Sequence, residues 1–431
     1  MKAAKYIIFL FIIFFFTMLG IRRVFNFSSK ENLNGIYQIP SFPAFTFDSL
    51  QKGTFQEPFT NYMENIPGLK GTFIRIRNQF DLSLFSIPHA VNVVCGKQKC
   101  LFGIDNIRSY EGSDFAGEKY LDTKISELKG LQEELWKQKK ILLLLIFAPD
   151  KATFFSELIP DRMVRKNRGL TNYTYYTEKC RASGINMIDF NRYFLQAKDT
   201  SRYPLYTKTG AHWSSYGAVR AADSMMKYLR AKLMVKLPEM VTYRIDSSLV
   251  PLNYDGDISN AMNLLWEIRQ PVMVYPQFTF KTDSSSIKPN ALFIGDSYYW
   301  LWSETGIIKN IFSNSEFRYY DKDVYPETYT KMMKTWELDP IKSIGRQNVI
   351  VLLQTSKVGE CDFGYGFVDR IYPDFDPSPK NRIKEIERFL VNIPGNMTRY
   401  EQLSKDFNAP IKAVIRTQAI FSGNELLKKK K

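Results

Sequence analysis

Three continuous apolar runs constrain the fold of this chain most strongly. The longest, ILLLLIFAP at 141–149, follows a segment at 120–140 whose apolar residues recur at helical spacing. Two shorter runs, at 291–294 and 348–353, are each followed by a helix-like segment. Strands that are apolar on both faces are typical of parallel sheets covered by helices. The sequence therefore predicts an α/β fold with a mostly parallel sheet flanked by helices.

Other segments continue this alternation. Helix-like patterns cover 172–182 and 214–233, and a short strand is expected at 185–188. Residues 24–55 are rich in Asn, Ser, Pro and Phe without a period, which indicates a tether. We expect the α/β domain at 56–395 and a C-terminal extension with a basic tail at 396–431.

The N-terminus begins with a hydrophobic segment between basic residues. The run YIIFLFIIFFFTMLGI at 6–21 follows two lysines and precedes Arg22 and Arg23, without a small-x-small cleavage site. It is slightly shorter than the roughly 20 residues of a typical membrane-spanning helix. A buried core helix is the alternative, but the run is apolar on every face. We expect residues 1–23 to form an uncleaved signal anchor.

Histidine and cysteine usage excludes several kinds of site. The chain has only two histidines, His89 and His212, which rules out a zinc site with three His ligands. Its four cysteines form no pair of C-x-x-C spacings, so no zinc ribbon is predicted. We expect neither a metal nor a cofactor. Cys95 and Cys100 flank a turn in the hairpin-like VVCGKQKCLFG, where either a disulfide or two thiols are consistent with the pattern.

The chain is strongly basic, with 59 Lys and Arg against 44 Asp and Glu and a net charge of +15. No RNP, helix-turn-helix or zinc-finger pattern accompanies this charge, and the basic residues are spread along the chain. We therefore expect no nucleic-acid partner. An anionic polymer or an anionic membrane surface suits the charge better.

The first motif that can carry chemistry is ALFIGDSYYW at 291–300. An apolar strand runs into Gly-Asp-Ser and then into a helix-like segment, so Ser297 should lie exposed at a tight turn. There the backbone N–H of Tyr298 can help to stabilise an oxyanion. The alternative is an ordinary N-cap serine. We expect Asp296 to be structural and to point away from the base.

The second motif is YTKTGAHWSSYG at 206–217. His212 lies in a glycine-containing loop just before a helix, whereas His89 follows a proline at the entry to an apolar strand. A histidine beside a tryptophan is often structural, but a serine nucleophile needs a base. We therefore predict Ser297 as nucleophile and His212 as base.

The order of these motifs resembles a known family. The anchor, VVCGKQKCLFG, IFAPDKA at 146–152, TGAHW at 209–213 and FIGDSY at 293–298 are similar to those of periplasmic alginate O-acetyltransferases of the AlgJ/AlgX type, over about residues 55–370. The resemblance implies an SGNH-hydrolase-like fold, His212 as base and Ser297 as nucleophile. It also implies a single-pass inner-membrane protein facing the periplasm or cell exterior, and a multi-spanning membrane O-acyltransferase that delivers acetyl groups.

The sequence departs from the family at one position of the Asp-x-His-Trp motif. The family's Asp, the acid of a Ser-His-Asp triad, corresponds to Gly210, and loss of such an acid costs about 10⁴-fold in serine proteases. Three interpretations follow. Another strand end supplies the acid, the enzyme uses a Ser-His dyad with support from backbone carbonyls, or the protein binds its polymer without catalysis. The candidate acids are Glu360, Asp362 and Asp150.

The sequence thus predicts an extracytoplasmic O-acetyltransferase that transfers acetyl groups to a polysaccharide, and the basic charge suits an anionic one. Tyr298, Tyr299 and Trp213 are the candidate oxyanion or substrate-binding residues, and Trp213, Tyr299 and Trp300 are candidates for stacking on sugar rings. One alternative is a carbohydrate esterase of the same fold. Others are acyl transfer to a different polymer, as in D-alanyl transfer proteins of teichoic acid systems, and a non-catalytic polysaccharide-binding or assembly component.

Overall fold

The chain divides into two compact units in the computed structural model. Unit 1 comprises residues 1–95 and 257–269, and unit 2 comprises 96–256 and 270–431. The structure describes residues 5–7, 9–10, 13–14, 17, 33–35, 40–64, 69–165, 167–326, 333–355, 363–378 and 380–428. Most of the predicted anchor at 1–23 lies outside the described residues, and within the described part no helix has the length and apolarity needed to cross a membrane. The predicted boundaries at 23, 55 and 395 stay predictions.

Unit 2 is built on a seven-stranded sheet with the strand order β10-β9-β8-β7-β11-β3-β4 among the described residues. Five strands run parallel, and β9 and β10 are antiparallel at one edge. The mostly parallel α/β architecture is therefore confirmed. The strands are β3 (Leu142–Ala148), β4 (Met187–Asp189), β7 (Ala291–Gly295), β8 (Ser315–Tyr319), β9 (Asp323–Pro326), β10 (Met333–Lys334) and β11 (Val349–Thr355).

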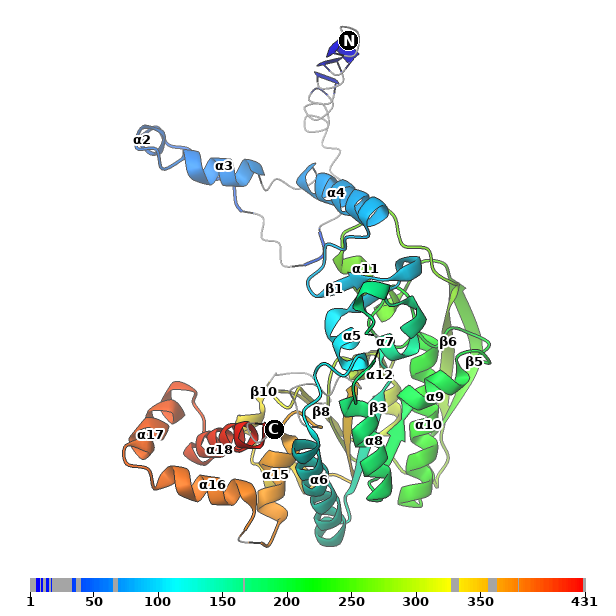
Figure 1. Ribbon diagram of the computed structural model, residues 1–431, viewed down its shortest axis with the longest axis vertical. Helices are drawn as coiled ribbons and strands as arrows, with labels where there is room; N and C mark the ends of the chain where they lie inside the picture. The colour runs from blue at the N-terminus through cyan, green and yellow to red at the C-terminus, as the bar shows by residue number, and fades with distance from the viewer. Residues whose placement is uncertain are drawn as a thin grey trace. The chain divides into compact units, whose positions relative to one another are not determined.

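Helices cover both faces of this sheet (Figure 1). Along β3, Leu143 and Leu145 pack with α6 (Glu118–Lys139), α8 (Asn172–Ala182) and α15 (Phe367–Phe375). Leu144 and Ile146 face the other way and pack with α9 (Phe190–Ala197), α10 (Ser215–Leu233), α12 (Tyr298–Glu304) and α13 (Ile307–Ile311). Because successive side chains of a strand point to opposite faces, burial on both faces requires the continuous apolar run of the sequence.

Shorter elements complete unit 2. Their bounds are β2 (Leu101–Gly103), α5 (Ile104–Tyr110), α7 (Lys151–Phe154), the antiparallel pair β5 (Glu239–Ser248) and β6 (Met273–Lys281), and α14 (Pro340–Ile344).

The C-terminal helices of unit 2 have a small core of their own. They are α16 (Arg382–Val391), α17 (Asn396–Asp406) and α18 (Ile411–Lys428), and Ile383, Leu390, Tyr400 and Ala419 are buried between them. Arg382 joins them to the sheet domain, because its guanidinium donates to Glu127 of α6 and to Asp369 of α15, at 2.9 Å each. Asp369 also pairs with the buried Lys124. This network therefore holds the C-terminal helices against α6 and α15.

Unit 1 contains α2 (Phe47–Gln51), α3 (Gln56–Glu64), α4 (Leu69–Phe85), β1 (Val93–Cys95) and α11 (Asp257–Ala261). Asn78 of α4 is buried and donates from Nδ2 to the Met262 carbonyl at 2.7 Å. Both sides of the predicted cysteine hairpin are short strands, β1 and β2. Cys95, Cys100 and Cys180 are buried thiols in the structure, and Cys361 lies outside the described residues.

Candidate active site

Ser297 lies at the carboxyl end of β7, as predicted. The strand ends at Gly295, Asp296 and Ser297 form the turn, and α12 begins at Tyr298. A Cβ at Gly295 would lie 2.5 Å from the Leu353 carbonyl oxygen of the neighbouring β11, so only glycine fits. The close approach of β7 to β11 therefore fixes where the turn leaves the sheet.

His212 approaches Ser297 from the loop before α10. The side chain of Ser214 caps that helix by accepting from the Gly217 N–H at 2.9 Å. Between them, Trp213 is completely buried and anchors the loop in the core. His212 is 8% exposed, and its Nε2 lies 2.8 Å from Ser297 Oγ. The structure thus brings together the two residues that the sequence singled out, within hydrogen-bond distance.

A buried lysine and a threonine hold the loop that leads to His212. Lys151 is 1% exposed, and its Nζ donates to the carbonyls of Gly210 at 2.5 Å and Lys208 at 3.0 Å. Thr207 Oγ1 accepts from the Gly210 N–H and donates to the Asp255 carbonyl, at 2.6 Å each. These bonds fix the backbone of Gly210 next to the 254–255 turn. Sequence reasoning missed Lys151, although it follows the strand end that the apolar run predicts.

The missing acid at Gly210 has a steric explanation. A Cβ at this residue would lie 2.4 Å from the Tyr254 carbonyl oxygen and 2.9 Å from that of Asp255. Backbone oxygens cannot move aside as a flexible side chain can. The space that a side chain at position 210 needs is therefore occupied by the turn at 254–255.

Of the three candidate acids, the structure describes only Asp150. Asp150 is completely buried, and its carboxylate accepts from Asn106 Nδ2 at 2.5 Å and from the Thr153 N–H at 2.9 Å. Burial raises the pKa of Asp150, and these hydrogen bonds oppose the shift. Asp150 thus caps α7 and hydrogen-bonds Asn106. Glu360 and Asp362 lie outside the described residues.

Asp296 ties the nucleophile turn to the neighbouring strand. Its Oδ1 accepts from the Tyr298 N–H at 3.0 Å, and its Oδ2 accepts from the Thr355 N–H at 3.1 Å and the Tyr365 hydroxyl at 3.2 Å. Burial raises the pKa of this carboxyl, whereas the two N–H groups and the nearby His212 lower it. These bonds match the structural role expected for Asp296.

The structure corrects the expected roles of the aromatic residues around Ser297. The Tyr298 N–H donates to Asp296, so in this arrangement it is engaged rather than aimed at an oxyanion. Trp213 and Tyr299 are 0% and 1% exposed, and a ring without exposed surface cannot stack on a sugar. The sequence shows that Tyr299 is close to Ser297 and that Trp213 follows His212, but not that both side chains face the core. Trp300 is only partly buried.

A different set of aromatic residues lies beside the nucleophile turn, at the end of β8 and just before α15. Tyr319 and Tyr320 end β8 and begin its turn, and Tyr365 precedes α15. Sequence reasoning missed them because β8 (SEFRY) contains two charged residues and shows no continuous apolar run. Arg318 in this strand is completely buried and donates to Glu316 at 2.7 Å, which explains the misleading pattern.

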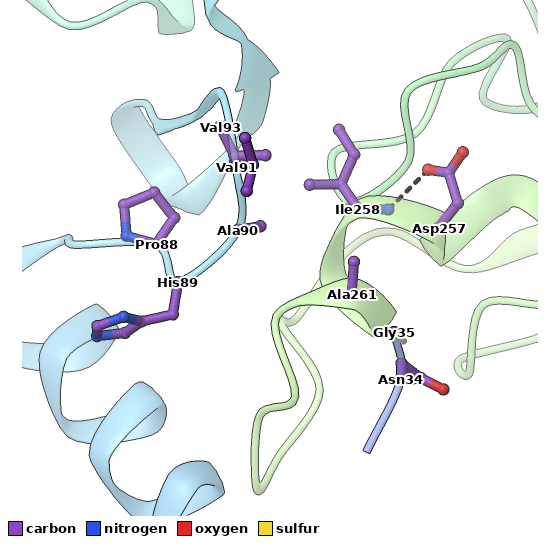
Figure 2. Close-up of a pocket in the computed structure, with 10 residues that line it drawn as sticks. All are labelled: Asn34, Gly35, Pro88, His89, Ala90, Val91, Val93, Asp257, Ile258 and Ala261. Atoms are coloured by element: carbon purple, nitrogen blue, oxygen red, sulfur yellow. Dashed lines mark hydrogen bonds between the residues drawn. The ribbon is translucent and has the colours of Figure 1, made fainter. Parts of the chain in front are cut away.

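The second histidine lies in unit 1, beside an open pocket of about 840 Å³ (Figure 2). His89 Nε2 is 2.6 Å from Asp81 Oδ2 of α4, and its ring points away from Ile258 and Ala261 of α11. The pocket is lined by Asn34, Gly35, Pro88, His89, Ala90, Val91, Val93, Asp257, Ile258 and Ala261. Across the residues that the structure describes, no group of three or more His, Cys, Asp or Glu side chains could hold a metal ion.

Comparison with known proteins gives a family match for part of the chain. Residues 93–299 match the family described as SGNH hydrolase-like domain, acetyltransferase AlgX, and this segment includes both His212 and Ser297. The resemblance predicted from the motifs is thereby confirmed over residues 93–299, which match an SGNH-hydrolase-like domain. No curated protein matches the chain.

Solved structures that are similar at low sequence identity include the following three. The O-acetyltransferase domain of Pseudomonas putida AlgJ is 17% identical with a TM-score of 0.40, covering 62% of this chain and 91% of that one. Pseudomonas aeruginosa AlgX is 17% identical with a TM-score of 0.41, covering 67% and 68%. Bacillus cereus PatB1 is 13% identical with a TM-score of 0.35, covering 56% and 91%.

Proposed function

We propose, from the premise that residues 93–299 match an SGNH hydrolase-like acetyltransferase family, that this protein transfers acetyl groups to a polysaccharide outside the cytoplasm. The family match supports O-acetyltransferase activity in general. The observation that carries the assignment of residues is the 2.8 Å separation of His212 Nε2 and Ser297 Oγ. In this proposal Ser297 is the nucleophile and His212 is the general base.

The first half of the reaction acylates the serine. His212 Nε2 takes the proton of the Ser297 hydroxyl while Oγ attacks the carbonyl carbon of an acetyl donor. The tetrahedral intermediate collapses with cleavage of the bond to the donor's leaving group, which receives the proton from His212. The product is acetyl-Ser297 and a neutral imidazole.

The second half transfers the acetyl group. His212 removes the proton of a sugar hydroxyl, and the sugar oxygen attacks the carbonyl carbon of acetyl-Ser297. The serine ester bond breaks, and Ser297 Oγ recovers the proton from His212. Both halves require a neutral imidazole with its proton on Nδ1, so that Nε2 can accept.

The surroundings of the imidazole support this role. The Tyr254 and Tyr298 rings lie 5.3 Å and 4.9 Å from the His212 ring, between ring centroids. The loop before His212 is fixed by Lys151 through the Gly210 carbonyl. Packing and loop hydrogen bonds thus restrict the orientation of the base. In this proposal Asp150 is not the acid of a triad, because its carboxylate caps α7 and accepts from Asn106.

The cellular setting is part of the proposal. An N-terminal signal anchor would hold the protein in the inner membrane with both units outside the cytoplasm. A multi-spanning membrane O-acyltransferase would then supply the acetyl group, and the net charge of +15 suits an anionic polysaccharide acceptor.

The test uses the purified protein with an aryl acetate as donor, with and without an oligosaccharide acceptor. We expect release of the aryl alcohol and transfer of acetyl to the acceptor, and loss of both in Ser297→Ala and His212→Ala. Acetate release that is indifferent to acceptor would instead indicate an esterase. Polymer acetylation in cells that survives both substitutions, but not deletion of the protein, would indicate a binding or assembly component.

A further inference from the structure

Two tyrosines of unit 2, one in the turn after β8 and one just before α15, meet beside the nucleophile turn. The Tyr320 N–H donates to the Gly295 carbonyl at 2.9 Å, and the Tyr365 hydroxyl donates to Asp296 Oδ2 at 3.2 Å. Their ring centroids are 5.0 Å apart and the rings are nearly perpendicular, at 86°. Gly295 and Asp296 are the two residues immediately before Ser297. Both tyrosines are therefore attached to the turn that presents the nucleophile.

Both tyrosines have an unusual backbone conformation. Tyr320 has φ of 52° and Tyr365 has φ of 57°, in the left-handed region that bulky residues rarely adopt. Tyr365 lies between Gly364 and Gly366, which also have positive φ. A strained conformation costs folding free energy and persists only where its surroundings enforce it, as at ligand-binding sites.

The strained turn at Tyr320 is held by a buried ion pair. The next residue, Asp321, has φ of 50° and is 8% exposed. Arg370 binds its carboxylate through two nitrogens, with Nη2 at 2.7 Å from Oδ1 and Nε at 3.0 Å from Oδ2. An asparagine or glycine would satisfy this turn at lower cost. Turn geometry by itself therefore does not favour a tyrosine here.

The Tyr320 side chain combines aromatic contacts with partial exposure. It is 37% exposed, and it packs against Tyr365 and against Tyr319, whose ring centroid is 4.3 Å away. The half-buried Trp300 and Tyr325 extend the aromatic surface from Tyr319, with centroids 5.0 to 5.8 Å apart. An aromatic ring that is held by its neighbours and partly exposed can bury the apolar C–H face of a sugar at little entropic cost.

We propose that Tyr320 forms an acceptor subsite, stacking on a sugar ring of the polysaccharide so that a hydroxyl of the chain reaches acetyl-Ser297. Tyr365 is a positioning residue that supports the Tyr320 ring through its contact with Asp296. This inference rests on the proposed function for its substrate class. It replaces Trp213 and Tyr299, which are buried, as the stacking residues.

The test compares Tyr320→Asn with Tyr320→Phe. Asparagine tolerates the left-handed backbone and removes the ring, whereas phenylalanine keeps the ring and removes only the hydroxyl. Tyr243→Asn on β5, where the tyrosine is 66% exposed, is the matched control. We expect Tyr320→Asn to raise the KM for a hexasaccharide acceptor by about tenfold. The rate at which Tyr320→Asn hydrolyses aryl acetate, a small donor, should stay within about twofold of wild type. Tyr320→Phe and Tyr243→Asn should stay within about twofold of wild type in both aryl acetate hydrolysis and acetyl transfer to the hexasaccharide.

A binding measurement separates this inference from the proposed function. In the Ser297→Ala protein, calorimetric titration with an oligomannuronate or cellohexaose hexasaccharide reports acceptor binding without turnover. Adding Tyr320→Asn should weaken the tighter of the two complexes by about tenfold. If acetyl transfer fails but this weakening is found, the subsite stands and the proposed reaction does not. The subsite is wrong if neither hexasaccharide binds or if Tyr320→Asn leaves the affinity unchanged. It is also wrong if Tyr320→Asn lowers aryl acetate hydrolysis as much as it lowers acetyl transfer to the acceptor.

Discussion

At the residue scale, the lack of a side chain at Gly210 determines which groups position the base, His212. The family resemblance predicts an acid here, yet a side chain would collide with the Tyr254 and Asp255 carbonyls. We expect Gly210→Asp to lower the free energy of unfolding by about 1–3 kcal/mol, as overpacking does, and to leave aryl acetate hydrolysis lower than wild type. Urea denaturation and initial rates measure the two effects.

The control for Gly210→Asp adds the same side chain where there is room. A Cβ at Gly71 in α4 would meet nothing closer than 3.8 Å, so Gly71→Asp should leave stability and rate nearly unchanged. A Gly210→Asp protein that is as stable as wild type and faster would contradict our account. That result would show that the loop has room for an acid at position 210 and that this acid improves catalysis.

At the element scale, the site depends on how the ends of β7 and β11 are joined. Asp296 accepts the Tyr298 and Thr355 N–H groups, and an asparagine amide accepts through only one of its two ends. Asp296→Asn should therefore lower the free energy of unfolding by about 1–3 kcal/mol and slow acylation by shifting Ser297. Guanidinium denaturation and burst kinetics with an aryl acetate test this.

The pH dependence of that substitution has a definite sign. Because burial raises the pKa of Asp296 above 3.8, ionisation costs stability only in the folded wild type. The stability deficit of Asp296→Asn should shrink as pH rises from about 3.8 to the raised native pKa, and then stay constant. A deficit that grows with pH over this range would contradict the role of burial. Asp223→Asn, in an exposed pair with Lys227, should show no such change.

The sequence predicts elements unequally, for physical reasons. Strands β3, β7 and β11 are buried on both faces, so their apolar runs identify them and also locate Ser297 at a strand end. The sequence does not identify β8 as a buried strand, because β8 contains Arg318 and Glu316. The ion pair that allows Arg318 to be buried is visible only in the folded structure. Tyr320 and Tyr365 are separated by 45 positions in the sequence, and only the tertiary fold brings their rings together.

At the scale of the whole molecule, a buried ion network attaches the C-terminal helices to the sheet domain. Burial alone would raise the pKa of Asp369, but Lys124 and Arg382 hold it below its usual value. Asp369→Asn leaves Lys124, whose side chain is 2% exposed, without its closest charge partner. We expect a loss of about 3–5 kcal/mol in unfolding free energy and faster proteolysis of 382–428.

The same network predicts a sensitivity to acid. A carboxyl whose native pKa is lowered stabilises the fold above the unfolded pKa, near 3.8, and this contribution disappears as pH falls through the native value. Wild type should therefore lose stability below about pH 4 more steeply than Asp369→Asn. Equal slopes in acid denaturation would contradict a charged Asp369. The exposed-pair variant Asp223→Asn should follow wild type, since surface pairs contribute about 0–1 kcal/mol.

The central claim is that Ser297 carries the acetyl group and that His212 activates it. Mass spectrometry of the protein quenched after mixing with an aryl acetate tests this directly. We predict one acetyl group on the Ser297 peptide, none there in Ser297→Ala, a rate of formation lower by about 10²- to 10⁴-fold in His212→Ala, and transfer of the label to an added oligosaccharide. Undiminished acetyl transfer by Ser297→Ala, or acetylation of the Ser297 peptide at the wild-type rate in His212→Ala, would contradict it.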